Sequence, residues 1–163
     1  MISIELNDAE VTRILSRVTA SFADMKPLMG EIGERLIFET EQRFHQGLSP
    51  EGTPWAPKSE VTAEKYRRKG ITVAFKPLFG ESGKLHSTLD YHAGADFVEV
   101  GSGAIYAAVM QFGAEKGASR EKPPIPWGPI PARPFIGISE VDRSNIANAV
   151  NDWLRSIVDT SIG

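Results

Sequence analysis

The chain has 163 residues, of which 41% are hydrophobic and 24% are charged, a composition typical of one ordinary globular domain spanning residues 1–163. Its formal net charge of −3 gives no general attraction to nucleic acid or anionic membranes, and the absence of cysteine excludes disulfides and thiolate chemistry. No apolar run approaches the ~18 residues of a membrane span, and the N-terminus lacks the pattern of a signal peptide, so we expect a soluble protein made inside the cell.

The N-terminal part of the chain predicts a short strand followed by two helices. Alternating apolar and polar residues are typical of a strand over residues 3–6. Apolar residues at helical spacing predict a first helix, capped by Asn7 and reaching Met25, and a second from Pro27 to the terminating Gly47. The predicted inner face of the second helix consists of Met29, Ile32, Leu36, Ile37, Thr40 and Phe44.

Residues 48–57 read as a proline-rich loop that contains Trp55. Large aromatic side chains are mostly buried, so we prefer an interpretation in which Trp55 packs on the core over one in which it anchors a partner. Ser59 can cap a short helix that Gly70 ends.

The middle of the chain predicts extended structure. Pro77 interrupts the apolar stretch 71–79, which favours an edge segment. Residues 85–91 are predicted to pair as an antiparallel strand with residues 97–100. After a break at residues 101–103, a short helix is expected over residues 104–112, with Gly113 as a left-handed cap. The predicted apolar stripe of this helix consists of Ile105, Ala108, Val109 and Phe112.

The C-terminal part predicts a strand over residues 135–138 and a last helix, which Ser139 and Asp142 begin as a capping box. Its inner face is expected to consist of Ile146, Ala149, Val150, Trp153, Ile157 and Val158. The fold class is therefore α+β: a small, mostly antiparallel sheet packed against three longer helices, with long Pro/Gly-rich loops.

The loop over residues 114–130 is long enough to suggest a function. Its proline-dense second half favours extended geometry, which would hold Ile125, Trp127 and Ile130 outward at low entropic cost. Trp127 either anchors a partner or folds back on its own sheet, and the sequence favours neither. Arg133 likewise either bonds loop carbonyls or a carboxylate, or bridges two subunits.

The motifs of known enzyme and metal chemistry are missing from the sequence. His45, His86 and His92 have no metal-ligand spacing, and two of them fall about 20 Å apart on one predicted strand. The serines lie outside a nucleophile elbow, and residues 101–103 lack the rest of a phosphate-binding motif. We expect no enzyme activity, no metal and no cofactor.

A basic cluster beside Tyr66 is the best candidate for contact with nucleic acid. Its cations are Lys65, Arg67, Arg68 and Lys69. Cations at a helix C-terminus also stabilise the helix dipole, and we rank that structural interpretation first. A small DNA-binding protein that uses this helix remains the alternative function.

Several short blocks resemble, in their order along the chain, the phage virion morphogenesis (tail-completion) family of Mu-like bacteriophages and prophages. The blocks cover roughly residues 30 to 140 and are Ser49–Trp55, Thr62 with Lys65, Ser82–Leu85, Tyr106-Ala107, Gln111–Gly113 and Ile130–Gly137.

This resemblance implies a structural protein of the virion, made in the host bacterial cytoplasm, that completes the tail or neck and helps to join head to tail. It would act by binding other tail and neck proteins and by self-association into a ring in the virion, with a monomer as an option for the isolated protein. A membrane partner is not expected, and contact with DNA is not favoured. Ring size, the partner's identity and an origin in an active phage or a prophage stay open.

Overall fold

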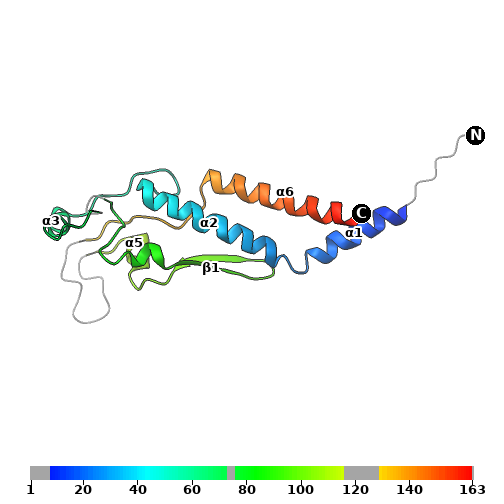
Figure 1. Ribbon diagram of the computed structural model, residues 1–163, viewed down its shortest axis with the longest axis horizontal. Helices are drawn as coiled ribbons and strands as arrows, with labels where there is room; N and C mark the ends of the chain where they lie inside the picture. The colour runs from blue at the N-terminus through cyan, green and yellow to red at the C-terminus, as the bar shows by residue number, and fades with distance from the viewer. Residues whose placement is uncertain (1–7, 73–75, 116–128, 163) are drawn as a thin grey trace, which may run out of the picture.

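The computed structural model describes residues 8–72, 76–115 and 129–162. Helix α2 (Lys26–Gln46) lies between helix α6 (Glu140–Ile162) and a β-hairpin, and the three run side by side along the middle of an elongated molecule (Figure 1). Helix α1 (Asp8–Ser21) lies at one end, and helices α3 (Glu60–Arg68) and α5 (Ala107–Phe112) lie toward the other. The predicted α+β class is confirmed. The strand predicted over residues 3–6 and Asn7, the predicted cap of the first helix, fall outside the described residues.

Helix α2 begins and ends where the sequence predicts. Pro27 occupies its first turn, and Gly47 follows its last residue in the left-handed conformation, with φ +76°. The buried side chains of α2 serve two apolar clusters. Leu28 and Ile32 pack with Ala149 of α6, and Phe44 belongs to a second cluster near the far end of the helix.

The hairpin consists of β1 (Leu89–Ala93) and β2 (Val98–Ser102), which pair antiparallel with Tyr91 opposite Val100. The backbone of α2 comes very close to this hairpin at Gly33. A Cβ atom at Gly33 would lie 2.3 Å from the Tyr91 ring, so only glycine allows this approach.

Three sequence predictions in the middle of the chain are wrong. Residues 84–87 form a helical turn, α4 (Lys84–Ser87), and not the start of a strand, because Leu85 is drawn into the second cluster. His86 is therefore not on a strand with His92. Strand β2 continues to Ser102, whose hydroxyl donates to the Leu85 carbonyl at 3.2 Å, so the glycine at 101 does not end it.

Residues 135–138 do not form the predicted strand in the described structure. The side chain of Gln111, and not a neighbouring strand, forms hydrogen bonds with the backbone of this segment. Gln111 Oε1 accepts hydrogen bonds from the N–H groups of Phe135 and Ile136 at 2.9 and 3.1 Å, and its Nε2 donates to the Ile136 carbonyl at 2.8 Å. One amide group thus satisfies three backbone groups.

The capping box at the start of α6 is confirmed. The Ser139 N–H donates to Asp142 Oδ2 at 2.6 Å, and the Asp142 N–H donates to Ser139 Oγ at 3.1 Å. The same Asp142 oxygen forms a buried ion pair with Arg43 of α2. Arg43 also donates to the Gly137 carbonyl at 3.2 Å, so it joins the end of α2, the segment before α6 and α6 itself.

Helix α1 contacts the C-terminal half of α6 and has no buried residue. The Phe22 ring lies 5.6 Å from the Trp153 ring, edge to face, and Arg17 Nη1 donates to the Thr160 carbonyl at 3.0 Å. The inner face predicted for α6 is half-buried or buried, as expected.

We expect Gly33→Ala to lower the free energy of unfolding by about 1–3 kcal/mol, because the new methyl group overlaps the Tyr91 ring. Gly30→Ala is the matched control, since nothing lies within 4 Å of the position that its Cβ would take. It should stabilise the protein by about 0.5–1 kcal/mol through helix propensity. Denaturant melts of both variants measure the difference, and equal effects would contradict the close approach of helix and hairpin.

We expect Asp142→Ala to lower the free energy of unfolding by about 3–5 kcal/mol, because it leaves the Arg43 charge buried without its partner. The exposed pair Arg35–Glu31, at 2.7 Å, provides the control. Glu31→Ala should cost about 1 kcal/mol or less in the same melts. A loss this small for Asp142→Ala would show that the buried pair does not hold the helices together.

Candidate functional site

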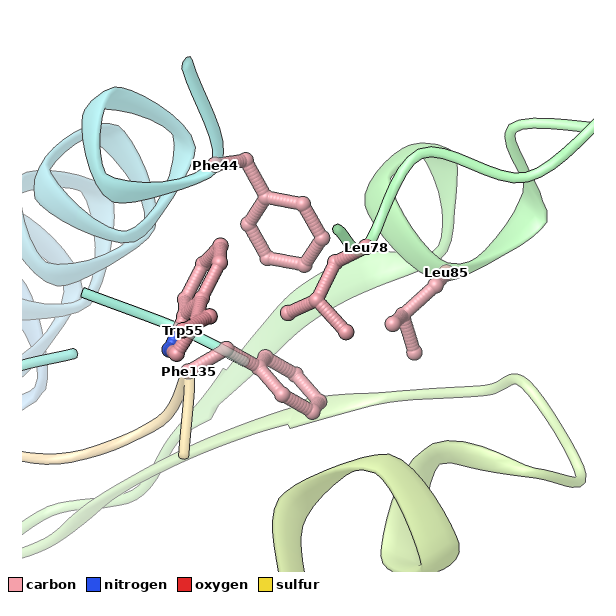
Figure 2. Close-up of a cluster of buried hydrophobic side chains, with 5 residues drawn as sticks. All are labelled: Phe44, Trp55, Leu78, Leu85 and Phe135. Atoms are coloured by element: carbon pink, nitrogen blue, oxygen red, sulfur yellow. The ribbon is translucent and has the colours of Figure 1, made fainter. Parts of the chain in front are cut away.

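The end of the molecule that contains α3, here called the α3 end, brings together most of the sequence-predicted site residues that the structure describes. Its base is the second apolar cluster, drawn in Figure 2: Phe44, Trp55, Leu78, Leu85 and Phe135. Three loops converge on this cluster from distant parts of the chain. The α3 end is therefore a set of loops held on one aromatic base.

Trp55 is a buried member of this base, with 6% of its surface exposed. Its ring lies 5.5 Å from the Phe44 ring, and its Nε1 donates to the Pro134 carbonyl at 2.7 Å. The preferred interpretation, in which Trp55 packs on the core, is confirmed.

Arg133 fastens the C-terminal loop to the loop that follows Trp55. Its Nε donates to the Ala56 carbonyl at 2.7 Å, and its Nη2 donates to the Pro57 carbonyl at 2.8 Å. The bonds to loop carbonyls, one of the two alternatives left by the sequence, are present. Burial lowers the pKa of Arg133 from its ordinary value, although the guanidinium stays charged at any physiological pH.

Lys58 lies beside Arg133 and was not singled out from the sequence. Its Nζ donates to the Lys76 carbonyl and lies 5.4 Å from the centre of the Tyr66 ring. Burial, with the charge of Arg133 as the second cause, lowers the pKa of Lys58 to about 8. A lysine just before the cap of a short helix belongs to no recognised sequence motif, so only the fold could show that Lys58 lies beside Arg133.

A pocket of about 790 Å³ opens between α3, the loop around Leu78, α5 and the residues that precede Arg133. Apolar side chains form much of its wall, including Leu78, Leu85 and Met110, while Lys58 and Arg133 supply positive charge. The volume lies in the range of pockets that bind small ligands.

The basic cluster on α3 is largely paired within the chain. Arg67 and Arg68 both bind Glu64, at 2.7 and 2.9 Å, and Lys69 binds Glu81 at 2.9 Å. Ser59 caps the helix by accepting the Thr62 N–H, as predicted. Lys65 is exposed, and this local pairing weakens the positive field that a DNA backbone would meet.

The short helix α5 and the residues just before it present apolar side chains of the predicted stripe to solvent. Ile105, just before α5, is 100% exposed, and Phe112 is 78% exposed. With the exposed Ala108 they form an outward row, here called the α5 stripe. No direction was predicted for this stripe from the sequence, and the structure sets it, because Tyr106, Ala107 and Met110 pack against the aromatic base.

The structure describes only some of the contact residues predicted in the loop over residues 114–130. Ile130 is half-buried and pairs with Ala114 in an isolated bridge, so both ends of the predicted loop are joined. Ile125 and Trp127 fall outside the described residues. Gly113 has the positive φ expected of it, but its ψ of 176° is not left-handed helical.

Two of the three histidines meet in the structure. The His45 and His86 rings lie 5.8 Å apart beside Phe79, a contact that the sequence did not predict. Within the described ranges, His, Asp and Glu side chains form no group of three or more that could hold a metal ion. None of the helices in those ranges is both long and apolar enough to span a membrane.

Comparison with known proteins places these features in a family context. The model of the phage virion morphogenesis family matches residues 6–155. The chain is 28% identical over 159 residues to "Mu-like prophage FluMu G protein 2" of Haemophilus influenzae, which covers 97% of this chain and 99% of that relative. It is 30% identical over 117 residues to "Putative capsid assembly protein G" of Escherichia phage Mu, covering 71% and 70%. No solved structure matches the chain.

The local pairing of the α3 cations predicts weak binding to DNA. We expect the unmodified protein to show no sequence-specific affinity at physiological salt. Replacing Arg67, Arg68 and Lys69 by alanine should weaken any residual binding and flatten its salt dependence. Fluorescence anisotropy with a labelled duplex over a salt series measures both effects.

A triple alanine variant at Lys26, Arg35 and Arg143, exposed cations of α2 and α6, is the control for total charge. Nanomolar, sequence-specific binding that the α3 variant alone abolishes would make DNA binding the leading function.

Proposed function

The chain belongs to the phage virion morphogenesis family, and on that premise we propose that it completes the tail or neck of a phage particle and helps to join head to tail. Its role is a structural one in the assembly of the particle. We propose that it acts by protein–protein binding within a ring of identical copies, without making or breaking covalent bonds.

The observation that carries this proposal is the α5 stripe. A fully exposed Ile105 and a largely exposed Phe112 cost free energy in water, and exposed apolar rows of this kind mark sites of protein association. The helix is positioned firmly, because Met110 and Tyr106 on its other side pack on the aromatic base. The α5 stripe is therefore a preformed surface on a rigid support.

A ring of identical subunits needs two different surfaces on each copy, because its interfaces are head-to-tail. The molecule has a second exposed apolar surface at the opposite end, formed by Val11, Leu15 and Phe22 and here called the α1 surface. Two unlike apolar surfaces at opposite ends of an elongated chain favour heterologous contacts over a twofold dimer.

The remaining candidates stay proposed partner contacts. Ile125, Trp127 and Ile130 belong to the loop whose ends the Ala114–Ile130 bridge joins, close to α5 in the chain. Arg133 and Trp55 support the loops of the α3 end from within, so we assign them the positioning of that surface.

Electron microscopy of assembled particles tests the ring. We expect several copies arranged around the axis at the neck or the end of the tail. A single copy, or no density at either place, would contradict the proposal.

We expect Ile105→Ser combined with Phe112→Ser to leave the melting temperature nearly unchanged and to reduce the yield of infectious particles severely. Both side chains are exposed in the isolated chain, so their loss removes little folding energy but removes the association surface. Val61→Ser on α3 is the control, because Val61 is 81% exposed and lies outside the α5 stripe. Full particle yield from the double variant would exclude the α5 stripe as an assembly surface.

A further inference from the structure

The hairpin has two outer edges, and its hydrogen bonds show which backbone groups each edge presents. The Gly94 N–H donates to the Phe97 carbonyl at 2.8 Å, and in an antiparallel ladder the residue pairs that exchange such bonds alternate with pairs that do not. Tyr91 and Val100 form a pair of the second kind. Their backbone groups therefore point outward, those of Tyr91 to the β1 edge and those of Val100 to the β2 edge.

A side chain closes the middle of the β1 edge, whereas the β2 edge is open. Asp90 Oδ1 accepts the Tyr91 N–H at 2.8 Å. On the β2 edge the outward groups are the backbone N–H and C=O of Val98, Val100 and Ser102, and none of them has a hydrogen bond to another described residue. An unpaired edge of this kind is a template for a strand from another chain.

The two faces of β2 determine the pattern of residues that an added strand needs. The side chains of Val98 and Val100 are half-buried on the face that packs on α2, whereas Glu99 is exposed on the other face. A strand that fits this edge therefore alternates apolar and polar residues, with its apolar residues on the α2 side.

We propose that the β2 edge of one copy binds residues 2–6 of a second copy as an added strand. This segment, which lies outside the described residues, has the required alternation and the five-residue length of β2. Its apolar residues are Ile2, Ile4 and Leu6, and its polar residues are Ser3 and Glu5.

The segment cannot reach the β2 edge of its own copy while α1 is attached to α6. The Met25 N–H donates to the Ala95 carbonyl at 2.8 Å, so β2 begins next to the start of α2. Helix α1 leads away from that point, and its first residue, Asp8, lies at the far end of a helix about 21 Å long (Figure 1). Asn7 alone lies between Asp8 and the segment, a link of at most ~7 Å. A second copy must therefore receive the strand.

The position of the α5 stripe supports the same arrangement. Ile105 of that stripe follows Ser102, the last residue of β2, by three positions. Contact between the α1 surface of one copy and the α5 stripe of the next would bring the residues before α1 toward the neighbour's β2 edge. This step rests on the proposed function, whereas the open edge does not.

A synthetic peptide with the sequence of residues 1–7 is the probe for the β2 edge. We expect it to slow hydrogen exchange of the Val98 and Val100 amides in the full chain by about tenfold at a peptide concentration of ten times Kd, because a bound amide is protected from exchange. The His92 and Glu99 amides, which bond within the hairpin, are the internal reference and should change much less. NMR measures the rates residue by residue.

Two methylated peptides test whether the probe binds as a strand. Neighbouring N–H groups of a strand point to opposite sides, so only one of the Ile4 and Glu5 N–H groups can point toward β2. N-methylation of that residue should abolish the protection, and N-methylation of the other should leave it nearly unchanged. Equal behaviour of the two methylated peptides, or no protection by the unmodified peptide, would overturn the proposal.

Cysteine pairs identify the second copy, because the chain has no cysteine of its own. Copies with Glu99→Cys are mixed, above the Kd of the peptide, with mass-tagged copies that carry Ser3→Cys or, in a second sample, Glu5→Cys, and are then oxidised. We expect a mixed disulfide dimer in at least one sample, since these side chains lie on the same face of the extended sheet. His92→Cys is the matched control and should give little mixed product, because it lies opposite Glu99 on the same exposed face but on β1.

No mixed dimer in either sample would exclude the exchange of this strand between copies. Dimers of Glu99→Cys alone would mean that two β2 edges pair with each other, which also contradicts the proposal. The peptide assay contains no assembled particle, so its failure would leave the proposed ring intact. A particle without a ring, together with a protected β2 edge, would contradict the proposed function and leave the added strand in place.

Discussion

The buried ion pair between Arg43 and Asp142 is the contact on which the arrangement of the chain depends. Its partners are 99 residues apart, and the side chains are 8% and 1% exposed. Charges removed from water in this way are stable only when each is paired and hydrogen-bonded, which restricts their neighbours to one geometry. Asp142 Oδ2 also accepts from the Ser139 N–H and hydroxyl, and Arg43 donates to the Gly137 carbonyl, whereas Asp142 Oδ1 is buried with no hydrogen-bond partner among the described residues. The pair therefore fixes where α6 begins relative to the end of α2.

The junction of α2 and α6 at the Arg43–Asp142 pair determines where the surfaces of the α3 end lie. Once the chain at Gly137 is fixed, the Gln111 amide holds residues 135–136 against α5, and Arg133 draws in the loop after Trp55. The described residues form a sheet of only two strands. Hydrogen bonds from polar side chains therefore hold these loops in place, as pairing with further strands would in a larger sheet. Loops held in this way can form long, irregular surfaces and still keep fixed positions relative to one another.

Local sequence signals were sufficient to predict the structure at positions where one residue determines the backbone conformation. The helix end at Gly47, the cap at Ser59 and the capping box at Ser139 and Asp142 could all be predicted, because each needs only near neighbours. The direction of the α5 stripe could not be predicted. A six-residue helix has apolar residues on both sides, and only the distant aromatic base decides which side is covered. The approach of Lys58 to Arg133 depends on the same long-range packing.

Helix α1 has a thermodynamic consequence for assembly. Because none of its residues is buried, and because Phe22 against Trp153 and Arg17 against Thr160 tie it to α6, its detachment requires much less free energy than unfolding of the body. A neighbour that covers the α1 surface would favour the state in which α1 is attached to α6. In the proposed ring, closure would then be coupled to the local ordering of one helix.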